Sequence, residues 1–180
     1  MRIVAGEYRG RTLKSPTWAG LRPTSDRLRE TLFNILGPSV HGAHVLDGYA
    51  GTGAIGIEAL SRGAASVTFV ERDPRAVKLI EANLHALGGG ADVKPVIIRA
   101  GLADATTRLG GQVFDLIILD PPYAHGAAVE ALTSAGALAA PQTRVIIEHA
   151  ARHAPPDAHA GLRRTRTVTA GDSALSFYER

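Results

Sequence analysis

The chain has 180 residues, of which 45% are hydrophobic, and its formal net charge is +3 at pH 7. This length and composition fit one domain with a substantial core, and the absence of cysteine excludes a disulfide framework and a thiolate metal site. No apolar stretch is long enough to span a bilayer and residues 1–6 lack the apolar region of a signal peptide, so we expect a cytoplasmic protein.

Positive charge is concentrated near the N-terminus. Within residues 1–30, seven basic residues oppose three acidic residues and leave a local net charge of +4. A second basic cluster stands at Arg163, Arg164 and Arg166. Localised positive charge of this kind is typical of proteins that bind polyanions, although chance clustering on a solvated surface is the alternative.

Residues 1–20 alternate apolar and turn-forming residues and predict a small β-hairpin arm. A helix is expected next, because Ser25 or Thr24 can cap its first turn and Gly37 with Pro38 can end it. The apolar residues of this helix recur at helical spacing, at Leu28, Leu32, Ile35 and Leu36.

From residue 44 onward, strands and helices alternate. Strands are expected at 44–47, 66–71, 96–98, 114–119 and 144–148, with helices at 54–62, 74–87 and 126–138. Segments 162–168 and 174–178 are typical of a terminal antiparallel pair. The pattern predicts an α/β fold with a mostly parallel, seven-stranded sheet and helices on both faces.

Three acidic residues, Asp47, Glu71 and Asp120, stand at the ends of predicted strands. Right-handed crossovers bring the carboxyl ends of parallel strands to one edge of the sheet, which is where α/β proteins bind ligands. We therefore expect these three side chains to converge on a ligand.

Residues 51–56 match the glycine-rich fingerprint G-x-G-x-x-G, and Glu71 lies 20 residues beyond Gly51. Such an acid can bind the ribose of either a nicotinamide dinucleotide or S-adenosylmethionine. Asp47 precedes the loop by four residues, where its charge would repel a pyrophosphate and favour an ammonium and a sulfonium group. The loop amides can still receive the carboxylate or ribose of S-adenosylmethionine, which the pattern therefore favours.

The sequence Asp120-Pro121-Pro122-Tyr123 predicts a rigid turn directly after a buried strand. Two consecutive prolines restrict the backbone and donate no N–H, so the Asp120 carboxylate and the Pro121 carbonyl are held outward. These two acceptors can receive both hydrogens of an exocyclic amino group while Tyr123 stacks on the attached ring. A strand cap followed by a purely structural turn is the alternative.

Residues 47–56 together with 120–123 resemble the Rossmann-like class I methyltransferases that modify exocyclic amino groups. Other stretches are similar to one bacterial family, the 16S rRNA (guanine(966)-N2)-methyltransferases known as RsmD. They are RIVAG and YRGR in the arm, LRPTSDRLRETLFN at residues 21–34, IEALSRGA at 57–64 and the ending FYER. The likeness covers nearly the whole chain, and residues 21–34 are its most specific part.

The resemblance implies S-adenosylmethionine-dependent methylation of a guanine N2 in 16S rRNA, within an assembling or assembled small ribosomal subunit and without a metal or a membrane. Residues 1–37 would be an RNA-binding extension of a methyltransferase domain at 38–180. Catalysis would fall to Asp120, Pro121, Pro122 and Tyr123. The cofactor would contact Asp47, Ala50, Gly51, Thr52, Gly53, Glu71, Arg72, Gly101, Leu102 and Asp120. The RNA would contact Arg9, Arg11, Arg22, Thr24, Arg27, Arg29 and Tyr123.

Two positions depart from the family pattern. Gly48 stands where a larger apolar residue is usual, and Ala100 replaces the Asp or Asn that usually accepts the adenine amino group. Backbone groups at Gly101 and Leu102, or the Asp104 carboxylate, would then make the adenine contact.

Other functions remain open at this point. A DNA adenine-N6 or cytosine-N4 methyltransferase shares the Asp-Pro-Pro-Tyr turn but normally carries a sizeable target-recognition region. A non-catalytic nucleotide- or RNA-binding module leaves Asp120 without a purpose, and a nicotinamide oxidoreductase has no evident use for the turn. Glu148, at the end of its strand, could contact substrate or cap the strand.

Overall fold

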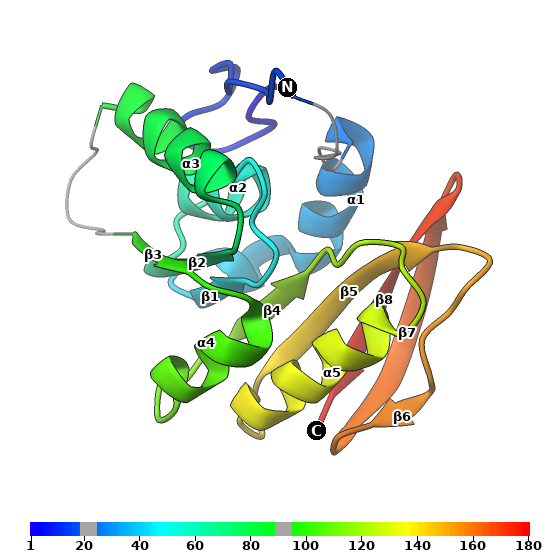
Figure 1. Cartoon of the computed structure of the whole chain (residues 1–180). Helices are drawn as coiled ribbons and strands as arrows, with labels where there is room; N and C mark the ends of the chain where they lie inside the picture. Colours follow the sequence, from blue (N-terminus) through cyan, green and yellow to red (C-terminus); the bar gives the residue numbers. More distant parts are fainter. Residues whose placement is uncertain (19–24, 89–94) are drawn as a thin grey trace.

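The computed structural model describes residues 1–18, 25–88 and 95–180 (Figure 1). In these ranges one sheet has the strand order β3-β2-β1-β4-β5-β8-β7-β6. The strands are β1 (His44–Asp47), β2 (Ser66–Glu71), β3 (Val96–Arg99), β4 (Leu116–Leu119), β5 (Arg144–Ala150), β6 (Ala158–His159), β7 (Leu162–Ala170) and β8 (Ser173–Glu179). The first five pair in parallel and the last three add antiparallel pairs, which confirms the expected α/β fold.

The sheet has one strand more than the seven expected. β6 is only two residues long and lies in a loop rich in Ala, Pro and His, so no strand pattern marks it. It exists because Ala158 and His159 pair with the start of β7, opposite Arg163 and Leu162. β6 therefore covers only the first part of the β7 edge.

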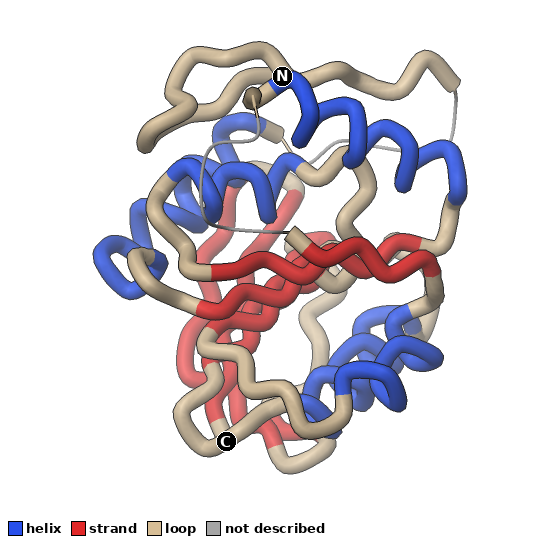
Figure 2. Tube along the Cα trace, turned by 90° about the vertical axis from the view of Figure 1, so that its left-hand side faces the viewer, coloured by secondary structure: helices blue, strands red, loops and turns tan. Residues whose placement is uncertain are grey.

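In the described part of the chain, five helices accompany the strands. They are α1 (Asp26–Leu36), which a short 3-10 turn η1 (Gly37–Val40) follows, α2 (Ala54–Ser61), α3 (Pro74–Ala86), α4 (Leu102–Leu109) and α5 (Ala127–Leu138). Residues of α1, α2 and α3 share one hydrophobic cluster with Val45 of β1, whereas α4 and α5 share the other with Leu46. Neighbouring residues of a strand point to opposite faces, so the helices form a layer on each side of the sheet (Figures 1 and 2).

The helix α4 is absent from the sequence-based expectations. Thr106 and Thr107 lie within its eight residues, and β-branched residues lower helix propensity. Its N-cap, Gly101, makes no side-chain capping bond. The helix is stabilised instead by packing, because Leu102, Ala105 and Leu109 are buried on one face. Local sequence signals do not reveal such packing, so they did not predict α4.

The expected β-hairpin arm is present in a short, irregular form. Residues 1–3 and 10–13 run antiparallel, with a bridge between Arg2 and Thr12. Backbone hydrogen bonds join the two halves, from Ile3 N to the Arg11 carbonyl at 3.0 Å and from Leu13 N to the Met1 carbonyl at 3.0 Å. The next two backbone donors bind α2 instead: Val4 and Ala5 donate to the Glu58 carboxylate at 2.8 and 3.0 Å. The arm is thus fastened along α2 rather than extended from the domain.

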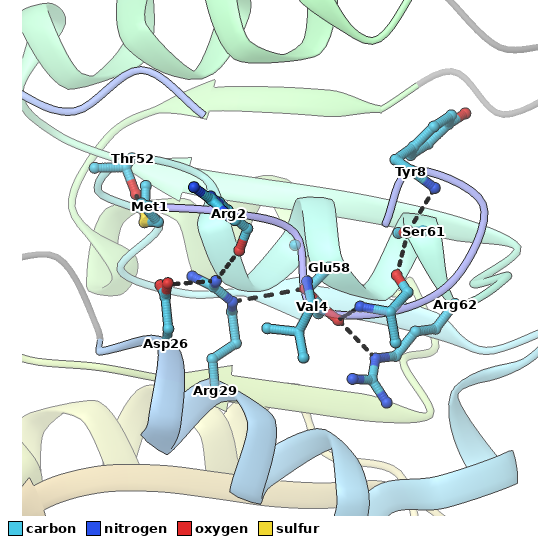
Figure 3. Close-up of polar contacts among 12 residues, drawn as sticks. Met1, Arg2, Val4, Tyr8, Asp26, Arg29, Thr52, Glu58, Ser61 and Arg62 are labelled. Carbon is cyan, nitrogen blue, oxygen red and sulfur yellow. Dashed lines mark hydrogen bonds and ion pairs between the residues drawn. The ribbon is translucent and has the colours of Figure 1, made fainter. Parts of the chain in front are cut away.

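A buried charge network joins the arm, α1 and α2 (Figure 3). The Arg29 side chain is fully buried, with Nε 3.6 Å from Glu58 Oε2 and Nη2 3.0 Å from Asp26 Oδ1. Nη2 also donates to the carbonyl of Arg2, and Arg62 Nε lies 2.8 Å from Glu58 Oε1. The Glu58 carboxylate therefore holds two arginines and two arm amides at once.

This network corrects the assignment of Arg29 to RNA binding. A fully buried guanidinium whose partners are Glu58, Asp26 and a backbone carbonyl cannot reach a phosphate at the surface. Ser25 caps α1 as expected, by accepting a hydrogen bond from Leu28 N at 3.2 Å, whereas Thr24 and Arg22 lie outside the described residues.

No described helix is both long enough and apolar enough to cross a membrane.

Candidate active site

A cavity of about 730 Å³ opens at the carboxyl ends of the parallel strands. Its lining includes residues that follow β1, β2, β3 and β4, together with Glu148 within β5, as expected for the ligand edge of an α/β sheet. Glu71 and Asp120 both line it, so the structure brings two of the three strand-end acids together. The whole turn from Asp120 to Tyr123 lines the same cavity.

The glycine loop forms the wall after β1. Gly51 and Gly53 have φ values of 53° and 78°, which residues with a side chain adopt at a cost. A Cβ on Gly56 would lie 2.3 Å from the Phe69 ring, so the last glycine lets α2 pack closely on β2. Each glycine of the fingerprint is therefore favoured at its position on steric grounds. The loop lines the cavity through Ala50, Gly51 and Thr52.

Glu71 is fixed at the end of β2 by two backbone donors. Gly51 N donates to its Oε2 and Asp73 N to its Oε1, both at 2.8 Å. The half-buried carboxylate keeps further lone pairs for hydroxyl donors in the cavity, and the exposed Arg72 lines the cavity beside it. This arrangement fits the ribose of S-adenosylmethionine.

Replacing Glu71 with alanine should weaken S-adenosylmethionine binding roughly ten- to hundredfold, since hydrogen bonds to a charged acceptor are worth about 1.5–3 kcal/mol. Isothermal titration calorimetry measures this directly. Glu81, exposed on α3 and outside the cavity lining, provides the matched control, and Glu81→Ala should bind as the wild type does. Equal affinities of the two variants would refute the assignment.

The predicted contact between Asp47 and the cofactor is not found. Asp47 is 1% exposed and does not line the cavity, and its Oδ2 accepts a hydrogen bond from Gly56 N at 2.9 Å. Burial raises the pKa of this carboxyl to about 7. Asp47 therefore holds the first turn of α2 and positions the loop from behind. Gly53, another expected contact, does not line the cavity either.

The four residues that line the cavity after β3 have no polar side chain. Ala100, Gly101, Leu102 and Ala103 line the cavity at the N-terminus of α4, where amide groups lack helical partners. Asp104 is exposed and is not part of the lining, so of the two expected adenine contacts the structure favours the backbone.

The family departure at Gly48 is compensated by Leu119. A Cβ on Gly48 would lie 2.4 Å from the Leu119 Cδ2 atom. Gly48 N also donates to the Ile118 carbonyl at 2.9 Å, which ties the loop to β4. The Leu119 side chain occupies the space that a larger residue would need.

Tyr123 is held at the cavity by two polar partners. Its hydroxyl donates to Glu148 Oε1 at 2.6 Å and lies 2.9 Å from Ser173 Oγ. The residue is 50% exposed, so the ring is accessible to a planar ligand. Partial burial, and then the hydrogen bond to Glu148, raise the pKa of Tyr123 to about 12, which keeps the phenol neutral at physiological pH.

Ser173 is a site residue that sequence reasoning missed. It begins β8, far along the chain from the turn, and reaches the cavity because β8 pairs antiparallel with β5, with Ser173 opposite Ala150. Trp18, Tyr49, Glu130 and Ser134 also line the cavity without a sequence signal. Among the residues that the structure describes, no group of three or more His, Cys, Asp or Glu could hold a metal ion.

The arginines predicted to bind RNA are placed unequally. Arg9 and Arg27 are exposed. Arg11 is exposed as well, but its Nη1 donates to the Leu87 carbonyl at 2.8 Å and its guanidinium lies 5.2 Å from the Tyr8 ring centroid. Two of these arginines therefore have side chains available to a polyanion, whereas Arg11 also ties the arm to the end of α3.

A protein-family model described as Conserved hypothetical protein 95 matches residues 1–179. The chain belongs to this family. Escherichia coli (strain K12) has a relative named Ribosomal RNA small subunit methyltransferase D, 36% identical over 183 residues that cover 100% of this chain and 90% of the relative. The relative of that name from Haemophilus influenzae is 41% identical over 133 residues, covering 74% of this chain and 69% of the relative.

Among solved structures, yhhF from Escherichia coli matches with 34% identity and a TM-score of 0.82, covering 100% of this chain and 97% of that chain. These findings confirm the family resemblance seen in the sequence. In this member of the Conserved hypothetical protein 95 family, the fixed carboxylate of Glu71, the amide-lined glycine loop and the N-terminus of α4 fit the ribose, carboxylate and adenine of S-adenosylmethionine.

Proposed function

We propose that this protein uses S-adenosylmethionine to methylate the exocyclic N2 amino group of a guanine in 16S rRNA, the guanine 966 type. One observation carries the proposal: the Asp120–Tyr123 turn and the Glu71 cofactor wall line one cavity. A group that accepts amino hydrogens thus lies beside the place where a methyl donor fits. The relatives named Ribosomal RNA small subunit methyltransferase D support rRNA over DNA as the substrate.

The turn acts on the amino group by orienting it. The lone pair of a guanine N2 is delocalised into the ring, which makes the nitrogen a poor nucleophile. Acceptance of its hydrogens by the Asp120 carboxylate and the Pro121 carbonyl favours a pyramidal nitrogen with a localised lone pair. S-adenosylmethionine supplies the methyl group to that nitrogen, and holding the two reactants in line supplies much of the rate enhancement.

Tyr123 and Asp120 have further parts in this mechanism. The target base must leave its stack to enter the cavity, and the Tyr123 ring, held by Glu148 and Ser173, replaces part of the lost stacking. Asp120 touches the amino group and is placed to take the proton that the methylated nitrogen releases.

We further propose that residues 1–37 provide the RNA-binding extension and that the substrate is a small ribosomal subunit or its assembly intermediate, which places the protein in the cytoplasm. The exposed Arg9 and Arg27 support this interface. Guanidinium groups suit phosphate oxygens because they offer paired donors in one plane.

Changing Arg9 and Arg27 together to glutamine should weaken binding to 16S rRNA and leave S-adenosylmethionine affinity unchanged. Loss of two phosphate contacts should flatten the log–log dependence of RNA affinity on salt by about 1.5 units. Filter binding over a salt series measures the slope. A double Arg108→Gln, Arg152→Gln variant removes two exposed arginines elsewhere and should keep the wild-type slope. An unaltered slope in the first variant would remove these arginines from the interface.

The function itself is tested by mass mapping of 16S rRNA from a strain that lacks this gene. The proposal predicts loss of one methyl group at a single guanine and its return when the wild-type gene is restored. Unchanged rRNA methylation in that strain would contradict it.

A further inference from the structure

A second carboxylate stands beside the Asp120 turn, and the mechanism above uses it only to hold Tyr123. Glu148 is 7% exposed and lines the cavity from within β5, the strand next to β4. The parallel register pairs Leu119 with Ile147, so Asp120 and Glu148 occupy the next position on neighbouring strands. Both carboxylates contribute to raising the pKa of the Tyr123 phenol, which lies near both.

One oxygen of this carboxylate is uncommitted. Oε1 accepts the hydrogen bond of the Tyr123 hydroxyl at 2.6 Å, and Ser173 Oγ braces the same hydroxyl. Oε2 receives no hydrogen bond from the described residues. It is also not a fully buried atom without a partner, so it is accessible from outside the protein. This oxygen therefore remains open to a ligand in the cavity. Hydrogen bonds to a charged acceptor are stronger than neutral ones, so an open oxygen on this largely buried carboxylate favours a ligand that brings an N–H.

We infer that Glu148 selects guanine by accepting the N1–H of the target base, an inference that rests on the proposed function. Guanine carries N1–H next to its N2 amino group, so one edge offers donors to Asp120, the Pro121 carbonyl and Glu148 together. Adenine and cytosine present a ring acceptor next to their amino group, and that lone pair would face the carboxylate. A site with a buried polar group rejects a ligand that leaves the group unpaired.

The test compares guanine with 2-aminopurine at the target position of otherwise identical small subunits. The analogue keeps the 2-amino group but has no N1–H. The wild-type protein should prefer guanine roughly ten- to hundredfold in kcat/KM, as expected for one hydrogen bond to a charged acceptor. Glu148→Gln, which keeps the side-chain shape, should reduce that preference to about threefold or less. Unchanged S-adenosylmethionine affinity shows that the variant is folded.

Tyr123→Phe is the matched control, because it removes the hydroxyl contact but retains the Glu148 carboxylate. It should lower turnover on both bases and keep the preference for guanine. If Glu148→Gln also keeps that preference, Glu148 only positions Tyr123 and the inference is wrong. Failure of the proposed function has a different signature: the wild-type protein would then methylate neither base.

Discussion

Replacing Asp120 with alanine should reduce methyl transfer by at least about a thousandfold while S-adenosylmethionine affinity changes little. Two effects combine in the loss. In the proposed mechanism the amino group is no longer oriented for attack, and the carboxylate proposed to take its proton is gone; proton transfer alone typically contributes 10²–10⁴-fold. Because the lost hydrogen bond belongs to the substrate, the cofactor should bind as before. Single-turnover transfer to small subunits, with calorimetry on the same protein, separates the two quantities.

The control for this experiment is Asp104→Ala. Asp104 is an exposed carboxylate near the cavity that does not line it, so its loss should leave turnover unchanged. Wild-type turnover in a folded Asp120→Ala protein would show that the turn is only structural.

The Glu58→Ala variant should lose about 3–5 kcal/mol of unfolding free energy, because Arg29 would remain buried without its carboxylate. For a domain of this size each 1 kcal/mol lowers Tm by about 2–4 °C, so a fall of roughly 6–20 °C is expected. The Val4 and Ala5 amides would lose their acceptor as well, so this part of the arm should loosen from α2, while the bond from Tyr8 N to Ser61 Oγ remains. Urea unfolding measures the free energy, and hydrogen exchange of the arm amides reports on its attachment.

A double-mutant cycle gives this prediction its control. Arg29→Met removes the buried positive charge, so the pair Arg29→Met, Glu58→Gln should lose less stability than the sum of the two single changes. Additive losses would show that the two side chains do not stabilise each other. Loss of stability without altered exchange in the arm would place the effect within α1 and α2.

The strands and the ligand edge of the sheet could be predicted because their signals are local. Apolar runs, glycine stops and strand-end acids at Glu71 and Asp120 each follow from a few neighbouring residues. α4 and β6 escape such reasoning because packing and pairing, rather than propensity, stabilise them. The hairpin of the arm could be predicted from local signals, but its attachment to α2 could not, because sequence alone does not show that Glu58 accepts from the Val4 and Ala5 amides.

The roles of charged residues in and around the site were also hard to predict from sequence alone. Asp47 was expected to contact the cofactor and Arg29 to contact RNA, because of their charges, yet both are buried. Asp47 holds the turn at Gly56, and Arg29 pairs with Glu58. Ser173 reaches Tyr123 only through the antiparallel pairing of β5 with β8. Residue type predicts which chemistry is available, whereas burial decides which residues can perform it.

The most direct test of the central claim is the identity of the methylated nucleoside. Small subunits that lack the modification are incubated with the purified protein and labelled S-adenosylmethionine, and their 16S rRNA is digested and separated by mass spectrometry. We predict labelled N2-methylguanosine from one position and its absence with the Asp120→Ala protein. Labelled N6-methyladenosine or N4-methylcytidine without N2-methylguanosine would contradict it.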